Sequence, residues 1–305
     1  MLTQAVESYL AVRRAFGFQL RVTEKLLHSF ARFTEVRGEQ IIQTKTAVEW
    51  AGLGSSPPQR ARRLGLVIRF AYYLHAEDQR HEIPPQGTFG NQTRTRPVPY
   101  IFSPEQICQI VSVASRPNTT GPLLLHTYST LFALLACTGL RVSEAIKLQC
   151  QDITTDGLVI RESKFHKTRL VPLHSTAQVK IEHYLTLRQR IASSQNDSLF
   201  INMQGKALSY WAVAWRFQTI LKVIGLDVPH AGHRPTLHSL RHTFAVRALE
   251  VCPRGRDRID KNIVALSTYL GHCNVNATYW YLEATPKLMT DIAEACDGLV
   301  KGATK

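Results

Sequence analysis

The sequence predicts a mainly α-helical protein with two domains and a small β-hairpin or sheet in the second domain. Apolar residues recur every three or four positions over most of the 305 residues, which is typical of helices that pack on a core. Residues 158–161 and 169–173 are typical of short strands, and together they predict a hairpin. Residues 82–100 contain four prolines and two glycines, so they predict a linker between the two domains.

Residues 1–83 are expected to form a bundle of four helices. Ser56 and the two prolines after it are typical of a helix start, and an apolar stripe follows them. Thr46 and Glu49 have the spacing of a capping box ahead of Trp50, which predicts a helix start at Thr46. The opposite face of the last helix carries four arginines, which form either an ordinary solvated face or a phosphate-facing one. These are Arg60, Arg62, Arg63 and Arg69.

The second domain is expected to open with a helix at Ser103, because serine at the N-cap, proline after it and Gln106 at the third helical position form a start signal. Residues 123–137 are apolar on nearly all sides, which predicts a buried helix that ends at Gly139. Amphipathic helices are then predicted over residues 176–191 and 210–224.

The positive charge is the informative feature of the composition. The net charge is +14 and the isoelectric point is about 9.7. The excess of lysine and arginine is spread over both predicted domains and the linker between them. A polyanion that contacts both domains explains this distribution, and DNA or RNA is the commonest such partner.

Cysteine usage and hydropathy predict a cytoplasmic protein with no membrane partner, and association with the nucleoid is expected if its partner is DNA. The six cysteines form no C-x-x-C pair, which is typical of free thiols in a reducing compartment. No apolar run approaches the length of roughly 18 residues that a membrane span needs. The first residues are amphipathic and lack the apolar core of a signal peptide.

Residues 236–250 carry the chemistry on which the functional hypothesis depends. His238 and Arg241 are three residues apart, so a helix places them on one face, and a Leu-Gly-His turn and a Tyr-Trp-Tyr triplet follow. Arginine matches phosphate oxygens, histidine moves protons near neutral pH, and an activated tyrosine can be a covalent nucleophile. The combination suits a phosphodiester, although an H-x-x-R pair by itself also arises by chance.

Two alternatives accompany this interpretation. Arg141 follows the buried helix, where it is costly to desolvate unless it meets an anion or an acid such as Glu144. Four histidines in or before residues 236–250 were weighed as metal ligands, but no glutamate of a zinc-binding helix accompanies them. They are expected to bond to backbone or phosphate, and neither a metal nor another cofactor is expected. These histidines are His230, His233, His238 and His242.

Four stretches within residues 124–282 together resemble the tyrosine recombinase, or phage integrase, family and its Xer/integrase-like members. In chain order they are LLACTGLRVSEAIKLQCQDI, ESKFHKTRLVPL, HSLRHTFA and LGHCNVNATYWYL. The resemblance implies a helical core-binding, DNA-binding domain over residues 1–85 and a basic linker over residues 86–100. It implies an α+β catalytic domain of the tyrosine recombinase type over residues 101–305.

The resemblance also implies which residues are catalytic. The two arginines would hold the non-bridging oxygens of the scissile phosphate, and the two histidines would orient or move protons. The lysine would protonate the departing 5′ oxygen, and the tyrosine would carry the 3′ phosphate. The set is Arg141, Lys164, His238, Arg241, His272 and Tyr281.

Two positions in this set leave an alternative open. The family often has glycines around its lysine, whereas this chain has Ser163 and Phe165, so Lys167 remains a substitute for Lys164. Tyr279 lies beside the expected nucleophile, but the step of nine residues from His272 to Tyr281 matches the family.

The function implied is site-specific recombination of DNA through a 3′-phosphotyrosine intermediate, for integration, excision or transposition of a mobile element. The expected partners are double-stranded DNA with specific recombination sites and three further copies of the chain, giving a homo-tetramer on DNA, or an assembly that includes other recombinases. The reaction would need neither a metal nor ATP. Two alternatives are a type IB topoisomerase, which relaxes one duplex, and a catalytically idle DNA-binding accessory subunit.

Overall fold

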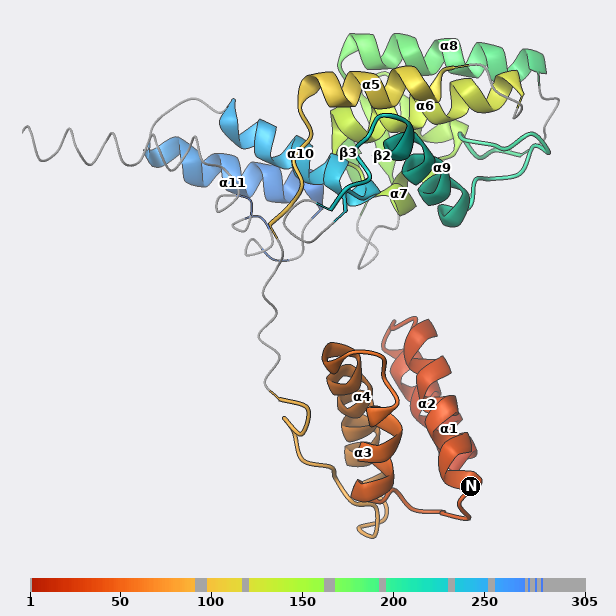
Figure 1. Cartoon of the computed structure of the whole chain (residues 1–305), viewed down its shortest axis with the longest axis vertical. Coiled ribbons are helices and arrows are strands. Elements are labelled where there is room, and N and C mark those ends of the chain that lie inside the picture. The colour runs from red at the N-terminus through yellow and green to blue at the C-terminus, as the bar shows by residue number, and fades with distance from the viewer. Residues whose placement is uncertain are drawn as a thin grey trace, which may run out of the picture. The chain divides into compact units, whose positions relative to one another are not determined.

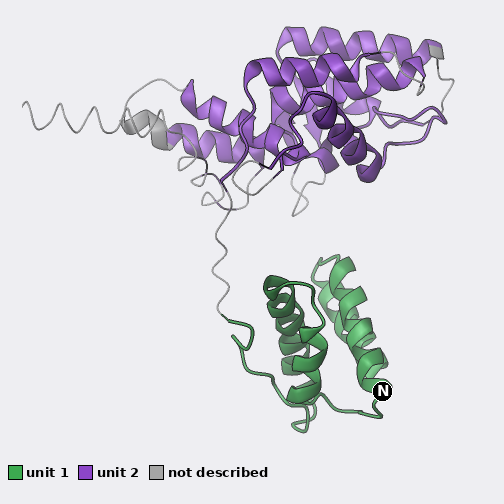
Figure 2. Ribbon diagram, viewed as in Figure 1, with its two compact units in different colours: residues 1–96 green, residues 97–305 purple. Residues whose placement is uncertain are grey.

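The computed structural model describes most of the chain and divides it into two compact units, residues 1–96 and residues 97–305 (Figure 2). Each unit has its own apolar core, and each is described by itself. In the described residues, no helix combines the length and the apolar character that crossing a membrane requires. The described residues are 2–90, 98–116, 121–161, 168–191, 196–229, 234–251, 256–271, Asn274, Thr278 and Tyr281.

The first unit is a bundle of four helices, as the sequence predicts (Figure 1). Its core is built around Phe30, Trp50 and Phe70, which are buried because the apolar stripes of the helices face one another. The edge of one aromatic ring meets the other where Phe30 and Trp50 pack, with ring centroids 5.3 Å apart. The helices are α1 (Leu2–Ala15), α2 (Arg21–Glu35), α3 (Thr44–Gly52) and α4 (Pro57–His75).

The start of α3 differs from the prediction. The helix begins at Thr44 with Gln43 as its N-cap residue, so Thr46 lies inside the helix and the predicted capping box is wrong. The hydroxyl of Thr46 donates instead to the carboxylate of Glu39, at 2.7 Å. The Thr46 hydroxyl, which the pattern assigned to capping, therefore bonds to Glu39, a residue outside the helix.

The four arginines of α4 divide into two pairs. Arg60 donates through Nε to the carbonyl of Gly54 at 2.9 Å, and the guanidinium of Arg63 lies 4.0 Å from the ring centroid of Trp50. Desolvation by burial lowers the pKa of Arg63. Arg62 and Arg69 are exposed. The bundle itself thus uses the first pair, and the second pair offers its charge to solvent.

The second unit is built around α6, which contacts α5, α8 and α10 (Figure 1). Buried residues lie on nearly every side of α6, as predicted, and the helix ends where Gly139 adopts a left-handed conformation with φ +60°. The helices are α5 (Pro104–Ala114), α6 (Pro122–Thr138), α7 (Val142–Lys147), α8 (Ser175–Ile191), α9 (Tyr210–Val223), α10 (Leu237–Glu250) and α11 (Arg256–Leu270), with a short 3-10 helix η1 (Cys150–Asp152).

The predicted hairpin is present within a three-stranded antiparallel sheet of order β1-β2-β3. The strands are β1 (Ile153–Thr154), β2 (Gly157–Ile160) and β3 (Arg169–Val171). In the register, Val159 of β2 pairs with Leu170 of β3. Strand β1 was not predicted because two residues are too short to show a period of two.

Two predicted helix starts are confirmed, and one helix of the structure was not predicted. The capping box at Ser103 is confirmed, since its Oγ accepts from the backbone N–H of Gln106 while the Gln106 side chain accepts from the backbone N–H of Ser103. Pro57 begins α4 after Ser56, also as predicted. Helix α11 was not predicted, although Ile263, Leu266 and Leu270 recur at helical spacing.

Candidate active site

Arg241 joins three helices at the centre of the candidate site. The residue lies on α10 and is 2% exposed. Its Nη1 donates to the carbonyl of Gly139 at the end of α6, and its Nη2 donates to the carbonyl of Leu270 at the end of α11, each at 2.7 Å. Carbonyl groups at helix C-termini lack partners within the helix and carry the negative end of its dipole, so they suit a buried cation.

The charge on Arg241 survives this burial. Desolvation, and then the positive charge of Arg141, lowers the pKa of Arg241 to about 10, while Tyr281 and Glu144 oppose the shift. A group with that pKa remains protonated at neutral pH. Arg241 therefore presents a fixed positive charge to Arg141 and Tyr281.

Arg141 lies just before α7 and makes the internal ion pair that was weighed from the sequence. Its Nη1 donates to Glu144 Oε1 at 2.7 Å, and its Nη2 donates to the carbonyl of Gly271 at 3.1 Å. The Arg141 side chain is 25% exposed, whereas the Glu144 side chain is 7% exposed. The ion pair thus fixes the orientation of Arg141 while part of its surface stays accessible.

Arg169, the first residue of β3, was not singled out from the sequence. Its Nη1 and Nη2 donate to the two oxygens of Glu144 at 3.2 and 2.9 Å, and its Nε donates to the carbonyl of Tyr269 at 2.8 Å. Burial alone would raise the pKa of Glu144, but the hydrogen bonds and charges of Arg169 and Arg141 outweigh it and lower that pKa. Glu144 is therefore a carboxylate at neutral pH, held between two guanidinium groups.

The C-terminal end of α11 is held by three arginines, one on each of three consecutive carbonyl groups. Gly271 follows the helix with φ +65°, and a Cβ at this position would lie 2.9 Å from Nη1 of Arg169. The arginine cluster therefore fixes the backbone of Tyr269, Leu270 and Gly271, directly before the predicted histidine. The pairs are Arg169 with Tyr269, Arg241 with Leu270, and Arg141 with Gly271.

Tyr281 packs along α10 rather than facing solvent. It is 2% exposed and belongs to a small apolar cluster that includes Ala245, Val246 and Leu249 of that helix. Its hydroxyl lies 3.3 Å from Nδ1 of His242. The tyrosine predicted to be the nucleophile is thus buried, and its hydroxyl oxygen lies next to a histidine.

His238 lies one turn before His242 on α10, with ring centroids 4.4 Å apart and the planes nearly perpendicular. The residue as a whole is exposed, yet protein atoms around its ring desolvate it, and this lowers its pKa. The charges of Arg241 and Arg141 lower that pKa further, and solvent at the exposed side limits the shift. The neutral imidazole is therefore favoured beside the arginine cluster.

The structure brings four of the six predicted site residues into one neighbourhood, namely Arg141, His238, Arg241 and Tyr281. The other two predicted residues and both alternatives lie outside the described residues, and these are Lys164, His272, Lys167 and Tyr279. Sequence reasoning missed Arg169 and considered His242 only as a metal ligand. The pattern H-x-x-R-H held a signal for His242, because it repeats a histidine after one helical turn.

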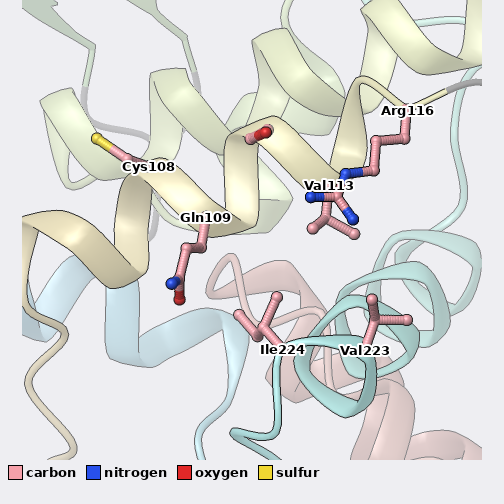
Figure 3. A pocket seen from close by; sticks show the side chains of 7 residues that line it. Cys108, Gln109, Val113, Arg116, Val223 and Ile224 are labelled. Carbon is pink, nitrogen blue, oxygen red and sulfur yellow. The ribbon is translucent and has the colours of Figure 1, made fainter.

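Two other kinds of candidate site were considered among the described residues, a metal centre and the pocket in Figure 3. In the described part of the chain, no group of three or more His, Cys, Asp or Glu side chains could hold a metal ion, while His230 and His233 lie outside that part. The pocket of about 370 Å³ in Figure 3 lies between α5 and the end of α9, lined by Gln109 and Ile224 among others. It contains no residue of the arginine cluster.

Comparison with known proteins gives the class. Residues 101–287 match the model of the phage integrase family. A putative integrase/recombinase, y4rB, of Sinorhizobium fredii is 37% identical over 94% of both chains. The tyrosine recombinase XerD of Listeria innocua is 28% identical over 78% of this chain and 76% of that protein.

Solved structures share the fold at lower identity. The Tn1549 transposon integrase in complex with transposon right end DNA has a TM-score of 0.67 at 15% identity, covering 96% of this chain and 99% of that one. The XerH site-specific recombinase bound to difH DNA has a TM-score of 0.64 at 18% identity, covering 90% and 77%. The chain belongs to the phage integrase, or tyrosine recombinase, family, and it is a site-specific recombinase.

Proposed function

We propose that this recombinase cuts and rejoins DNA strands with Tyr281 as the nucleophile and with Arg141 and Arg241 as the groups that stabilise the phosphate. The observation that carries the proposal is the cluster of guanidinium groups beside a tyrosine hydroxyl. Arg141 and Arg169 bind one carboxylate, Glu144, and Arg241 interacts with it only electrostatically, so these described side chains leave an excess of two positive charges for an anion. Fixed positive charges stabilise the extra negative charge that a phosphodiester gains in the transition state.

In the first step, the Tyr281 oxygen would attack the phosphorus and the bond to the 5′ oxygen would break. The resulting 3′-phosphotyrosine conserves the bond energy, so a 5′ hydroxyl of a second strand can reverse the step without ATP. Lys164, with Lys167 as its alternative, would protonate the departing 5′ oxygen, and His238 and His272 would orient the reacting groups. Those roles rest on the family resemblance.

The partner proposed is double-stranded DNA at specific sites, engaged by four copies of the chain on two duplexes. Two of the relatives above were solved on DNA, one of them on a transposon end and the other on a recombination site. The exposed Arg62 and Arg69 of α4 give the first unit a positive surface of its own, which supports a DNA-binding role for that unit. A mobile element is the proposed context.

A nicked suicide substrate tests the proposal. Cleavage close to the nick releases a short fragment that carries the 5′ hydroxyl, and without this hydroxyl the strand cannot be rejoined. The covalent intermediate is therefore trapped. The native protein should form a covalent complex, and mass spectrometry of the digested complex should place the nucleotide on Tyr281. Tyr281→Phe should bind DNA with the affinity of the native protein and form no covalent adduct. Tyr279→Phe should still form the adduct. An adduct on Tyr279, or relaxation of supercoiled DNA without site dependence, would contradict the proposal.

A further inference from the structure

His242 occupies the position from which a base could act on the nucleophile. It lies on α10, directly after Arg241 and one turn after His238. Its Nδ1 is 3.3 Å from the Tyr281 hydroxyl, and the two ring centroids are 5.5 Å apart. This is the reacting oxygen of the proposed function, on which the inference rests.

The packing of α10 fixes both members of this pair. The ring of Tyr281 lies in the apolar cluster with Ala245, Val246 and Leu249, which follow His242 at helical spacing on the same helix. The same cluster includes Ile263, Leu266 and Leu270 of α11, so both helices hold the aromatic ring, and its hydroxyl lies next to His242 in the preceding turn of α10. His242 is half-buried and its ring packs against that of His238, which limits its freedom to turn away.

The chemistry of cleavage needs such a neighbour. A phenol has an ordinary pKa of about 10, so at neutral pH nearly all of it is protonated and weakly nucleophilic. Its proton must leave as the bond to phosphorus forms, and imidazole accepts protons in this pH range. The positive charge of Arg241, which interacts with Tyr281, stabilises the phenolate that develops at the same time.

We propose that His242 is a catalytic residue that accepts the proton of Tyr281 during strand cleavage. The Tyr281 oxygen forms the bond to phosphorus, its proton passes to Nδ1 of His242, the bond to the 5′ oxygen breaks, and that oxygen takes a proton from Lys164. During rejoining each transfer is reversed, and His242 returns the proton to the tyrosine as it leaves. His242 is thereby distinct from His238, whose pKa is lowered by burial and by the charges of Arg241 and Arg141.

The test compares single-turnover cleavage of the nicked substrate by the native protein, His242→Gln and His242→Asn. Both amides can keep a hydrogen bond to the hydroxyl but cannot accept its proton. Cleavage should slow by about 10²–10⁴-fold, the usual contribution of a general base, while DNA affinity and thermal unfolding stay as in the native protein. The matched control is His183→Gln, an exposed histidine on α8, which should cleave at the native rate.

A chemical rescue separates proton transfer from positioning. Replacing Tyr281 with a fluorinated tyrosine, whose phenol is more acidic, should recover much of the lost rate in His242→Gln and should not accelerate the native protein to the same degree. A 5′-bridging phosphorothiolate, whose sulfur leaves without a proton, should rescue Lys164→Ala and leave His242→Gln slow.

Each other outcome has a definite meaning. Cleavage at the native rate by both amide variants would overturn the role of His242 and leave the proposed function intact. Slow cleavage with no recovery by the fluorinated tyrosine would make His242 a positioning residue and would also overturn the inference. Failure of the native protein to form a covalent complex would instead count against the proposed function.

Discussion

At the scale of single residues, Gly139 shows how backbone and chemistry depend on one another. It ends α6 in a left-handed conformation, and its carbonyl accepts the hydrogen bond from Arg241. A Cβ at this position would lie 2.5 Å from Cδ1 of Phe244, a distance that no ordinary contact reaches. Glycine is required here both by its φ and by its lack of a side chain.

Gly139→Ala should therefore destabilise the second unit and slow DNA cleavage. The left-handed conformation costs about 1–2 kcal/mol for a residue with a Cβ, and forced overpacking adds about 1–3 kcal/mol. Gly225→Ala is the control, because Gly225 has φ +71° and open space around its Cβ position. Urea titration of residues 97–305 should show a clearly larger loss for Gly139→Ala, and equal losses would mean that Phe244 moves aside freely.

The residue scale also shows what the sequence could predict about the site. Arg141, His238, Arg241 and Tyr281 could be predicted as site residues because the motifs that contain them are local in sequence. Arg169 could not be found in this way, because its partners Glu144 and Tyr269 are 25 and 100 residues away along the chain.

At the scale of elements, the end of α11 is held by Arg141, which directly precedes α7, and by residues of α10 and β3. Arg169 is the contribution of β3, the strand that follows the connection carrying Lys164. Arg169 thus links β3, which follows the connection that carries Lys164, to the backbone just before His272. A change at Arg169 should therefore alter the positions of proposed catalytic residues that it does not contact.

Arg169→Met is expected to lower the free energy of unfolding by about 1.5–3 kcal/mol, the range for hydrogen bonds to a charged group, and to slow cleavage. Arg161→Met is the matched control, since Arg161 also pairs with a buried carboxylate, Asp152, but its own side chain is 56% exposed. The control should lose less than about 1 kcal/mol. Equal losses in urea titrations would show that β3 is not anchored through Arg169.

Glu144 gives the second unit a specific response to acid. Its pKa is lowered in the folded protein, so its stabilising contribution is complete above the ordinary carboxyl pKa and is lost as the pH falls through the lower folded value. Glu144→Gln should be less stable than the native protein at pH 7, and its stability should fall less steeply below about pH 5. Thermal unfolding measured across this range, with the exposed Glu182→Gln as control, checks the slope.

The elements themselves differ in how well sequence predicts them. Long helices such as α4 and α6 were predicted because their apolar patterns and end signals span many residues. The predicted start of α3 was wrong because Thr46 bonds to Glu39, a tertiary partner that no local pattern reveals. Strand β1 was missed because two residues are too few to form a pattern.

At the scale of the whole molecule, the charge of +14 predicts strongly salt-dependent DNA binding that involves both units. The logarithm of the affinity should fall with the logarithm of salt concentration by about 0.9 for each phosphate neutralised. The slope for the whole chain should exceed that for residues 97–305, and residues 1–96 should bind weakly on their own. An isolated second unit with the affinity and slope of the whole chain would show that the first unit is not part of the interface.

The mainly α-helical class, with a helical bundle and a small sheet, was predictable because each part has a local signature. The domain boundaries at residues 85 and 100 stay a prediction, as do the roles of Lys164 and His272. The hydrogen bonds from three arginines to the end of α11 could not be predicted. They join side chains to backbone carbonyl groups that are distant in the sequence.

If Tyr281 and Arg241 act as proposed, their burial, each 2% exposed, would give the enzyme a second stage of discrimination between DNA sequences. A duplex would have to uncover both before a bond could break, with free energy from contacts made elsewhere on the DNA. A sequence with poor contacts can occupy the protein without opening it, and it then dissociates uncut. Selectivity in cutting would therefore exceed selectivity in binding, and weak sites in a genome would be bound without being cut.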